Sequence, residues 1–158
     1  MMRVLINWIL LACWLRFIFG ASTDAMSADH TSHFLFPFLR WLSPGMSVET
    51  MDWIHFFIRK SAHMTEYGIL YLLSWRAFRG TATPAWEWRR AAGALLFAAL
   101  FAASDEYHQS FVPSREASVR DVMIDITGAS LALACIWAWK RRRRGREPVH
   151  EADAARRG

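Results

Sequence analysis

Charged and hydrogen-bonding side chains gather at a few places in an otherwise apolar chain, and their spacing indicates shared helix faces. Side chains three, four or seven positions apart lie on one stripe of a helix. Cationic groups on such stripes can hold a phosphate or carboxylate, hydroxyl and amide groups can hydrogen-bond to it, and carboxylates can orient the bases. We therefore predict one anion-binding site formed by Lys60, His63, Tyr67, Glu106, Gln109, Arg115, Asp121 and Asp125.

The same region could instead carry out a reaction. His63 or His108 could act as a general acid or base together with a neighbouring carboxylate such as Glu106. The reaction would be the transfer or hydrolysis of a phosphoryl or acyl group. No Ser or Cys stands in a recognisable nucleophile motif, so a covalent mechanism lacks support, and whether any reaction follows binding stays open.

A metal site is a weaker interpretation of these residues. Segments 63–66 and 105–108 each place a carboxylate and an imidazole three residues apart, and helical bundles can bind metals with such pairs. However, Lys60 and Arg115 would oppose a divalent cation beside them. We therefore expect neither a metal ion nor another cofactor.

A purely structural role for the charges is the third interpretation. In that case His63 and Arg115 would neutralise Glu66, Asp121 and Asp125, and the network would only fix the register of the helices. Buried ion pairs are costly to desolvate, and apolar side chains would fill these positions at lower cost. We therefore favour a binding role.

The elements that must position these residues are membrane helices. Of the 158 residues, 54% are hydrophobic and 15% are aromatic, which excludes a disordered chain. A helix crosses roughly 30 Å of hydrocarbon with about 20 residues. The expected fold is an all-α integral membrane bundle of four transmembrane helices, at about residues 4–20, 61–78, 88–103 and 119–139.

The distribution of basic residues predicts the orientation of these spans. Cytoplasmic loops carry an excess of Lys and Arg, and most of them fall inside when both termini are cytoplasmic, including the run from Lys140 to Arg144. We thus expect a multi-pass membrane protein with both termini in the cytoplasm. All intramembrane charges then lie in the outer third, and the inner two thirds are expected to be apolar. Because the dense basic run is a topology signal, we expect no nucleic-acid binding.

The segment between the first two spans has a pattern of its own. Residues 21–32 are polar and predict a loop, whereas residues 33–42 are aromatic and apolar, broken by Pro37, and too short to span. The latter pattern predicts an interfacial or re-entrant piece. Ser47 could cap a helix that begins at Val48 and merges with the second span. Residues 1–139 would form the membrane domain and residues 140–158 a basic, disordered cytoplasmic tail.

Two blocks of polar residues resemble the VanZ-like family of small bacterial membrane proteins. The first is Arg59-Lys60-Ser61-Ala62-His63 followed by Glu66-Tyr67-Gly68; the second is Asp105-Glu106-Tyr107-His108-Gln109-Ser110-Phe111-Val112-Pro113-Ser114-Arg115, then Ser118, Asp121, Asp125 and Gly128. The resemblance covers residues 59–130. It implies that the signature positions are Lys60, His63, Tyr67, Glu106, Gln109, Arg115, Asp121 and Gly128.

Two positions depart from the family pattern. Ser114 stands where the family usually has Gly, and Asp125 stands where Asn is common. The first could stiffen the loop, and the second adds a carboxylate to the site.

The resemblance implies a multi-helix inner-membrane protein, linked in some members to tolerance of glycopeptide antibiotics such as teicoplanin. It does not imply a particular reaction. Together with the outer position of the charges, it favours recognition of an anionic lipid or a cell-envelope glycolipid head group. Membrane lipids are the expected partners, and the oligomeric state stays open.

Overall fold

All regular secondary structure in the described part of the chain is helical, as predicted. The computed structural model describes residues 2–80, 88–115 and 117–144. The elements are α1 (Met2–Ala21), a short 3-10 helix η1 (Asp24–Met26), α2 (Ala28–Leu42), α3 (Val48–Arg79), α4 (Trp88–Gln109) and α5 (Val119–Arg144). Three parts of the chain lie outside the described residues. They are the connection around Glu87, which is predicted to be cytoplasmic, position Glu116 shortly before α5, and residues 145–158 of the predicted tail.

Each predicted span lies on one of the four long helices. The prediction that a helix begins at Val48 and merges with the second span is confirmed by α3, which runs from Val48 to Arg79. Ser47 caps this helix, since its hydroxyl oxygen accepts a hydrogen bond from the Thr50 amide at 3.2 Å. At the other end of the chain, α5 continues to Arg144, so residues 140–144 are helical.

The segment between α1 and α3 differs from the prediction. Residues 28–32, predicted as loop, form the start of α2, and the helix continues through Pro37 without a break. Ser27 caps the helix by accepting a hydrogen bond from the His30 amide at 3.4 Å. Proline in a helix interior removes one backbone hydrogen bond. Contacts with α3 support the helix despite this loss: Thr31 Oγ1 lies 2.8 Å from His55 Nε2, and the Phe36 ring packs edge-on against the His55 ring.

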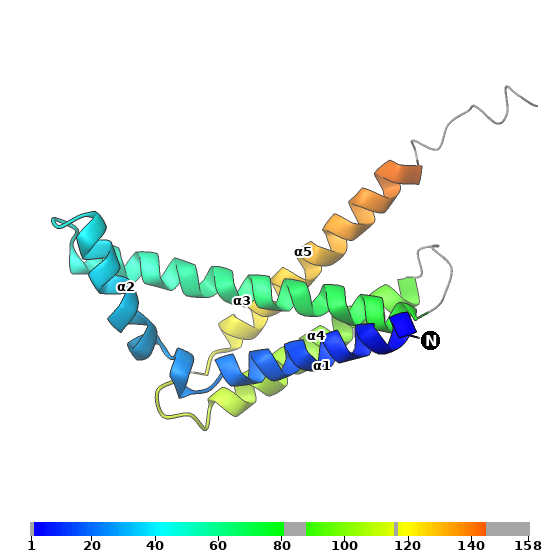
Figure 1. Cartoon of the computed structure of the whole chain (residues 1–158), viewed down its shortest axis with the longest axis horizontal. Coiled ribbons are helices and arrows are strands. Elements are labelled where there is room, and N and C mark those ends of the chain that lie inside the picture. Colours follow the sequence, from blue (N-terminus) through cyan, green and yellow to red (C-terminus); the bar gives the residue numbers. More distant parts are fainter. Residues whose placement is uncertain (1, 81–87, 116, 145–158) are drawn as a thin grey trace, which may run out of the picture.

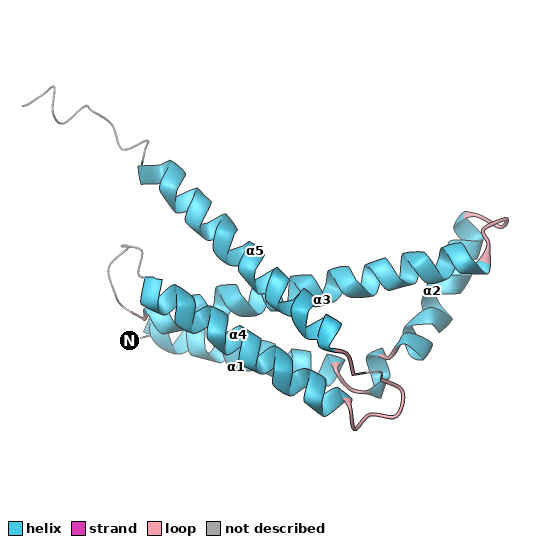
Figure 2. Cartoon of the chain, turned by 180° about the vertical axis from the view of Figure 1, so that it is seen from behind, coloured by secondary structure: helices cyan, strands magenta, loops and turns pink. Residues whose placement is uncertain are grey.

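Helix α3 is the central element of the bundle. It packs against α1, α2, α4 and α5, and in Figures 1 and 2 it runs beside α1 while α5 crosses it obliquely. Small side chains at every third or fourth position of α4 face the core and allow close packing. The buried core comprises Leu11, Ile18, Tyr67, Leu70, Tyr71, Ala77, Ala94, Ala98, Ala102 and Ala129.

The crossing of α3 and α5 depends on two glycines. A Cβ atom at Gly128 would overlap the backbone of Met64, and one at Gly68 would lie 3.5 Å from the Gly128 carbonyl oxygen. The two backbones therefore touch without side chains between them. This close approach brings the polar residues that lie one and two turns before Gly128 against α3.

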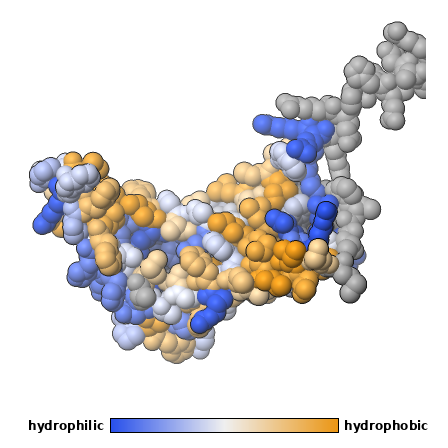
Figure 3. Space-filling model, viewed as in Figure 1, coloured by the Kyte–Doolittle hydropathy of each residue, from blue (hydrophilic) through white to orange (hydrophobic). Residues whose placement is uncertain are grey.

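The outer surface of the helices is apolar. Met2–Ala21 and Val119–Arg143 are long and apolar enough to cross a membrane, with mean hydropathies of 1.9 and 1.6. Leu5 and Ile9 on α1, Leu96 and Leu100 on α4, and Leu131 on α5 are all exposed, and apolar residues cover broad areas of the face in Figure 3. These features indicate a membrane protein; that α3 and α4 also cross the membrane stays a prediction.

Candidate functional site

The predicted stripes on α3 and α5 face each other. Lys60 donates a hydrogen bond from Nζ to Oδ1 of Asp121. One turn further along both helices, Nδ1 of His63 lies 3.4 Å from Oδ1 of Asp125. The helical spacing of both stripes was visible in the sequence, and the Gly128 crossing brings them into register.

Several polar groups in this cluster are buried without a complete set of partners. Tyr67 is 0% exposed and Asp125 is 1% exposed. Within the described residues, the Tyr67 hydroxyl, Asp125 Oδ1 and His63 Nδ1 lack a hydrogen bond of regular geometry, and the contact between His63 and Asp125 is the long one of 3.4 Å. Buried polar groups normally find partners, so these atoms are exceptions that require an explanation.

Arg115 binds main-chain oxygens instead of a carboxylate. Its Nη2 and Nε lie 3.0 and 3.3 Å from the Thr23 carbonyl oxygen, and Nη2 also donates to the Ala21 carbonyl. Carbonyls at a helix end lack intrahelical partners and carry partial negative charge. The side-chain pairing of Arg115 expected from the structural interpretation is therefore not what the structure shows. Burial lowers the pKa of Arg115, but a guanidinium stays charged.

Glu106 and Gln109 also tie segments together. The Glu106 carboxylate accepts a hydrogen bond from the Ser118 amide, just before α5. Gln109 Nε2 donates to Asp105 at 3.0 Å, and the Ser22 hydroxyl donates to the other oxygen of Asp105 at 2.6 Å. These contacts fix the ends of α1 and α4 and the start of α5 relative to one another.

Two participants in this network were absent from the predicted site. Asp105 is a polar residue four positions before Gln109, but the predicted site does not contain it. Ser22 had no signal beyond being a small polar residue at the end of an apolar segment. A contact between residues 83 positions apart cannot be inferred from helical spacing.

His108 is the candidate that the structure does not bring to the cluster. Its ring packs against Phe19 of α1 with 4.5 Å between ring centroids. Its buried Nδ1 has no hydrogen-bond partner among the described residues. His63 is therefore the better candidate for acid–base chemistry.

Comparison with known proteins identifies the family of the chain. The VanZ/LLP1 family matches residues 7–140 of the chain, a range that includes every residue of the candidate site. The chain belongs to the VanZ/LLP1 family. No curated protein and no solved structure shows significant similarity to it.

The polar stripe of this VanZ/LLP1 protein reaches deeper than expected. Tyr71 and Ser74 follow Tyr67 on the same face of α3, and both are 0% exposed. Their hydroxyls have no hydrogen-bond partner within the described residues. Buried neutral hydroxyls therefore continue along this face of α3 beyond its charged residues.

The acidic residues and histidines do not assemble into a metal site in the part of the chain that the structure describes. No group of three or more His, Cys, Asp or Glu side chains there has metal-binding geometry. The two carboxylate–imidazole segments of the VanZ/LLP1 chain are also separated, because His63 faces Asp125 and His108 faces Phe19.

Proposed function

We propose that this VanZ/LLP1 protein is a four-span plasma-membrane protein, with both termini in the cytoplasm, that recognises the polar head group of an envelope lipid at the outer leaflet. The observation that carries the proposal is the cluster of Lys60, His63, Asp121 and Asp125 beside the fully buried Tyr67 hydroxyl. Ionisable residues inside membrane proteins usually mark functional sites. The physiological role would lie in envelope maintenance or glycopeptide (teicoplanin) tolerance.

The spacing of tryptophans on α3 supports this placement. Trp53 and Trp75 are 22 residues apart, or about 33 Å along a helix, close to the thickness of the hydrocarbon core. Tryptophan is enriched at both membrane interfaces. At the Trp75 end, Lys140 lies 4.7 Å from the Trp75 ring and Arg143 lies 4.1 Å from the Trp139 ring, as expected for the cytoplasmic interface.

The depth of the candidate site follows from the same spacing. Lys60 and His63 lie seven and ten residues after Trp53, or roughly 10–15 Å below the outer interface. By the same measure Lys60 lies 15 residues, or roughly 22 Å, from Trp75, and His63 lies 12 residues, or roughly 18 Å, from it. The Lys60–Asp121 pair is therefore the outermost part of the cluster in this orientation, and a head group from the outer leaflet would contact it first.

The balance of charge favours a glycolipid head group over a simple anion. Lys60 is already paired with Asp121, and Arg115 is held by carbonyl oxygens. Asp125 and nearby Glu66 place two carboxyl groups beside any ligand, and a phosphate alone would offer them no hydrogen-bond donor. Sugar hydroxyls can donate to Asp125 and accept from Tyr67, while a phosphate contacts Lys60 and His63.

Native mass spectrometry of the purified protein with its co-extracted lipids tests this proposal. We expect the wild type to retain a defined envelope glycolipid or anionic lipid, and His63→Ala to lose it. The matched control is His30→Ala, because the His30 side chain is 56% exposed and lies outside the cluster. Retention of the same lipid by wild type and His63→Ala would overturn the proposal.

A resistance assay tests the physiological role separately. Expression of the wild type in a susceptible host is expected to raise the minimum inhibitory concentration of teicoplanin, and His63→Ala is expected to abolish the increase. An unchanged inhibitory concentration with the wild type would reject the link to glycopeptide tolerance, whatever the lipid measurement shows.

A membrane enzyme acting at the same site is the second candidate function. The 3.4 Å approach of His63 to Asp125 favours it, because an imidazole paired with a carboxylate is a common general base. The substrate would be a lipid phosphate or acyl ester. Incubation of the retained lipid with wild type and Asp125→Asn distinguishes the two candidates, since only the enzyme hypothesis expects conversion that depends on Asp125.

A purely structural role is the third candidate, and the paired charges favour it. Lys60–Asp121 and the Arg115 contacts would then only hold the helices together. If the role is purely structural, Lys60→Met should lower the thermal stability of the protein. No variant should then lose a bound lipid.

A further inference from the structure

Helix α2 carries an exposed aromatic stripe away from α3. Phe34, Phe38 and Trp41 stand at positions i, i+4 and i+7, and their exposed fractions are 82%, 54% and 76%. Leu39, on the opposite side, is buried. A helix with aromatic residues on one free face and polar residues beside them is typical of segments that lie in a membrane interface.

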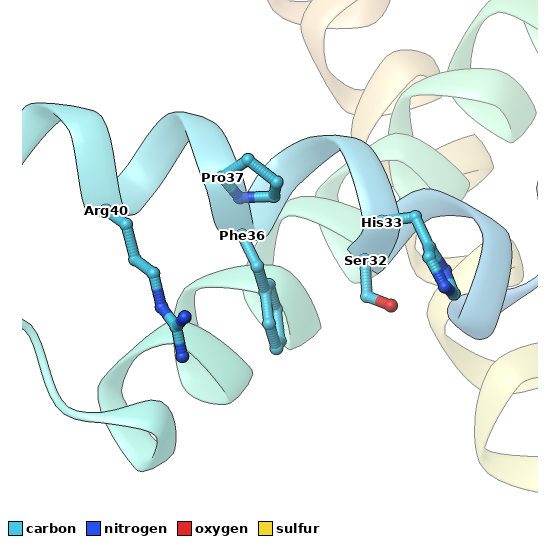
Figure 4. A pocket seen from close by; sticks show the side chains of 5 residues that line it. All are labelled: Ser32, His33, Phe36, Pro37 and Arg40. Atoms are coloured by element: carbon cyan, nitrogen blue, oxygen red, sulfur yellow. The ribbon is translucent and has the colours of Figure 1, made fainter.

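An open groove of about 400 Å³ runs beside this stripe. Figure 4 shows that Ser32, His33, Phe36 and Arg40 project to the same side of α2. Pro37 completes the lining. The groove therefore combines two basic side chains with an apolar wall between them.

The polar groups of the groove are available to an anion. Arg40 is exposed and forms no ion pair within the described residues. His33 Nδ1 donates to the Asp29 carbonyl at 2.6 Å, so its Nε2 is the nitrogen left for a ligand. The Ser32 hydroxyl also donates to that carbonyl, at 2.7 Å. The planar guanidinium of Arg40, with the His33 ring on the same side of the helix, suits a phosphate.

The groove lies at the depth of lipid phosphates if the orientation under the proposed function is correct. The Phe36 ring packs edge-on against the His55 ring with 6.0 Å between centroids. His55 is two residues from Trp53, which marks the outer interface in that orientation. Arg40 lies one turn further along α2, on the aqueous side of this level, where head groups are found.

We propose that this groove binds the phosphate of an anionic glycerophospholipid from the outer leaflet. Arg40 and His33 contact the phosphate, Phe36 and Pro37 contact the glycerol and upper acyl chain, and the aromatic stripe anchors α2 in the interface. This site is distinct from the cluster on α3 and α5. The inference uses the orientation proposed above but not the head-group recognition proposed there.

Lipid titration followed by native mass spectrometry tests the groove. The full-length protein is titrated with phosphatidylglycerol and, separately, with phosphatidylcholine of the same acyl chains. We expect preferential phosphatidylglycerol binding that weakens about tenfold or more in Arg40→Gln, because a charge-assisted hydrogen bond to phosphate is lost. The matched control is Arg120→Gln, an equal charge change at an exposed residue outside the groove; it should bind as the wild type does.

Three results would overturn the groove proposal. They are equal affinity for the two lipids, equal weakening in Arg40→Gln and Arg120→Gln, and displacement of the lipid by inorganic phosphate at a matching concentration. Repeating the titration in a His63→Ala background separates this site from the one on α3 and α5. Loss of the Arg40 effect there would assign the lipid to the α3–α5 cluster and reject the groove, whereas an unchanged effect supports the groove whatever the co-extracted lipid does.

Discussion

Arg115 illustrates how a residue that resembles a ligand-binding group can act as a positioning group. Its guanidinium binds the carbonyl oxygens of Ala21 and Thr23 and so ties the loop before α5 to the end of α1. A carboxylate ligand would have to compete with these contacts. Among the predicted site residues, His63, Tyr67 and Asp125 are the ones with buried polar atoms that lack a hydrogen-bond partner within the described residues.

Substitution of Arg115 is expected to reduce stability before it affects binding. Arg115→Gln removes charged hydrogen bonds to main-chain carbonyls, each worth about 1.5–3 kcal/mol, and should lower the thermal unfolding midpoint in detergent. Arg120→Gln, at an exposed site, is the control and should leave the midpoint unchanged. If the two variants unfold at the same temperature, the tie between the loop and α1 contributes nothing.

The residue pairings show where sequence reasoning succeeds and where it fails. The stripes of Lys60 and His63 on one helix and Asp121 and Asp125 on another followed from helical spacing, and the structure brings them together. The partners of Arg115 are backbone oxygens, which every residue has, so no side-chain pattern identifies them.

At the scale of elements, the crossing of α3 and α5 controls the geometry of the site. Gly128 touches the backbone of Met64, which lies next to His63. Any side chain at position 128 must push the helices apart and separate His63 from Asp125. A small residue at the crossing is thus a condition for the polar cluster.

Gly128→Ala is expected to destabilise the bundle. Overpacking of a close contact typically costs about 1–3 kcal/mol, so the unfolding midpoint should fall and the lipid retained at the cluster should be lost. Gly93→Ala on α4 is the matched control, because a Cβ there meets nothing within 4 Å, and its midpoint should not fall. If Gly128→Ala is as stable as the wild type, α3 and α5 must cross with a geometry that leaves room for a Cβ atom at position 128.

The elements themselves were largely predictable, with one informative exception. The apolar runs and the Ser47 cap predict the positions of the long helices, because these signals come from residues close together in the sequence. The start of α2 and its continuation through Pro37 were missed, since α2 is stabilised by packing on α3. That packing includes the hydrogen bond between Thr31 Oγ1 and His55 Nε2 at 2.8 Å and the contact of the Phe36 ring with the His55 ring.

At the scale of the whole molecule, different polar groups lie at the two ends of the helical bundle. Lys60 of the candidate cluster and the α2 groove lie towards Trp53, and Lys140 of α5 lies against Trp75. Figure 1 shows α2 and the start of α3 extending past the end of α1. Both proposed lipid sites therefore depend on which end faces the outside of the cell.

Cysteine labelling in spheroplasts is the most direct test of that orientation. Cys13 and Cys135 are first replaced by Ser, and single cysteines are placed at Ser110, between α4 and α5, and at Arg141, near the end of α5; both positions are exposed. We predict that a membrane-impermeant maleimide labels Ser110→Cys in intact spheroplasts and Arg141→Cys only after lysis. Labelling of Arg141→Cys without lysis, with Ser110→Cys protected, would place the polar cluster on the cytoplasmic side and contradict recognition of an outer-leaflet lipid.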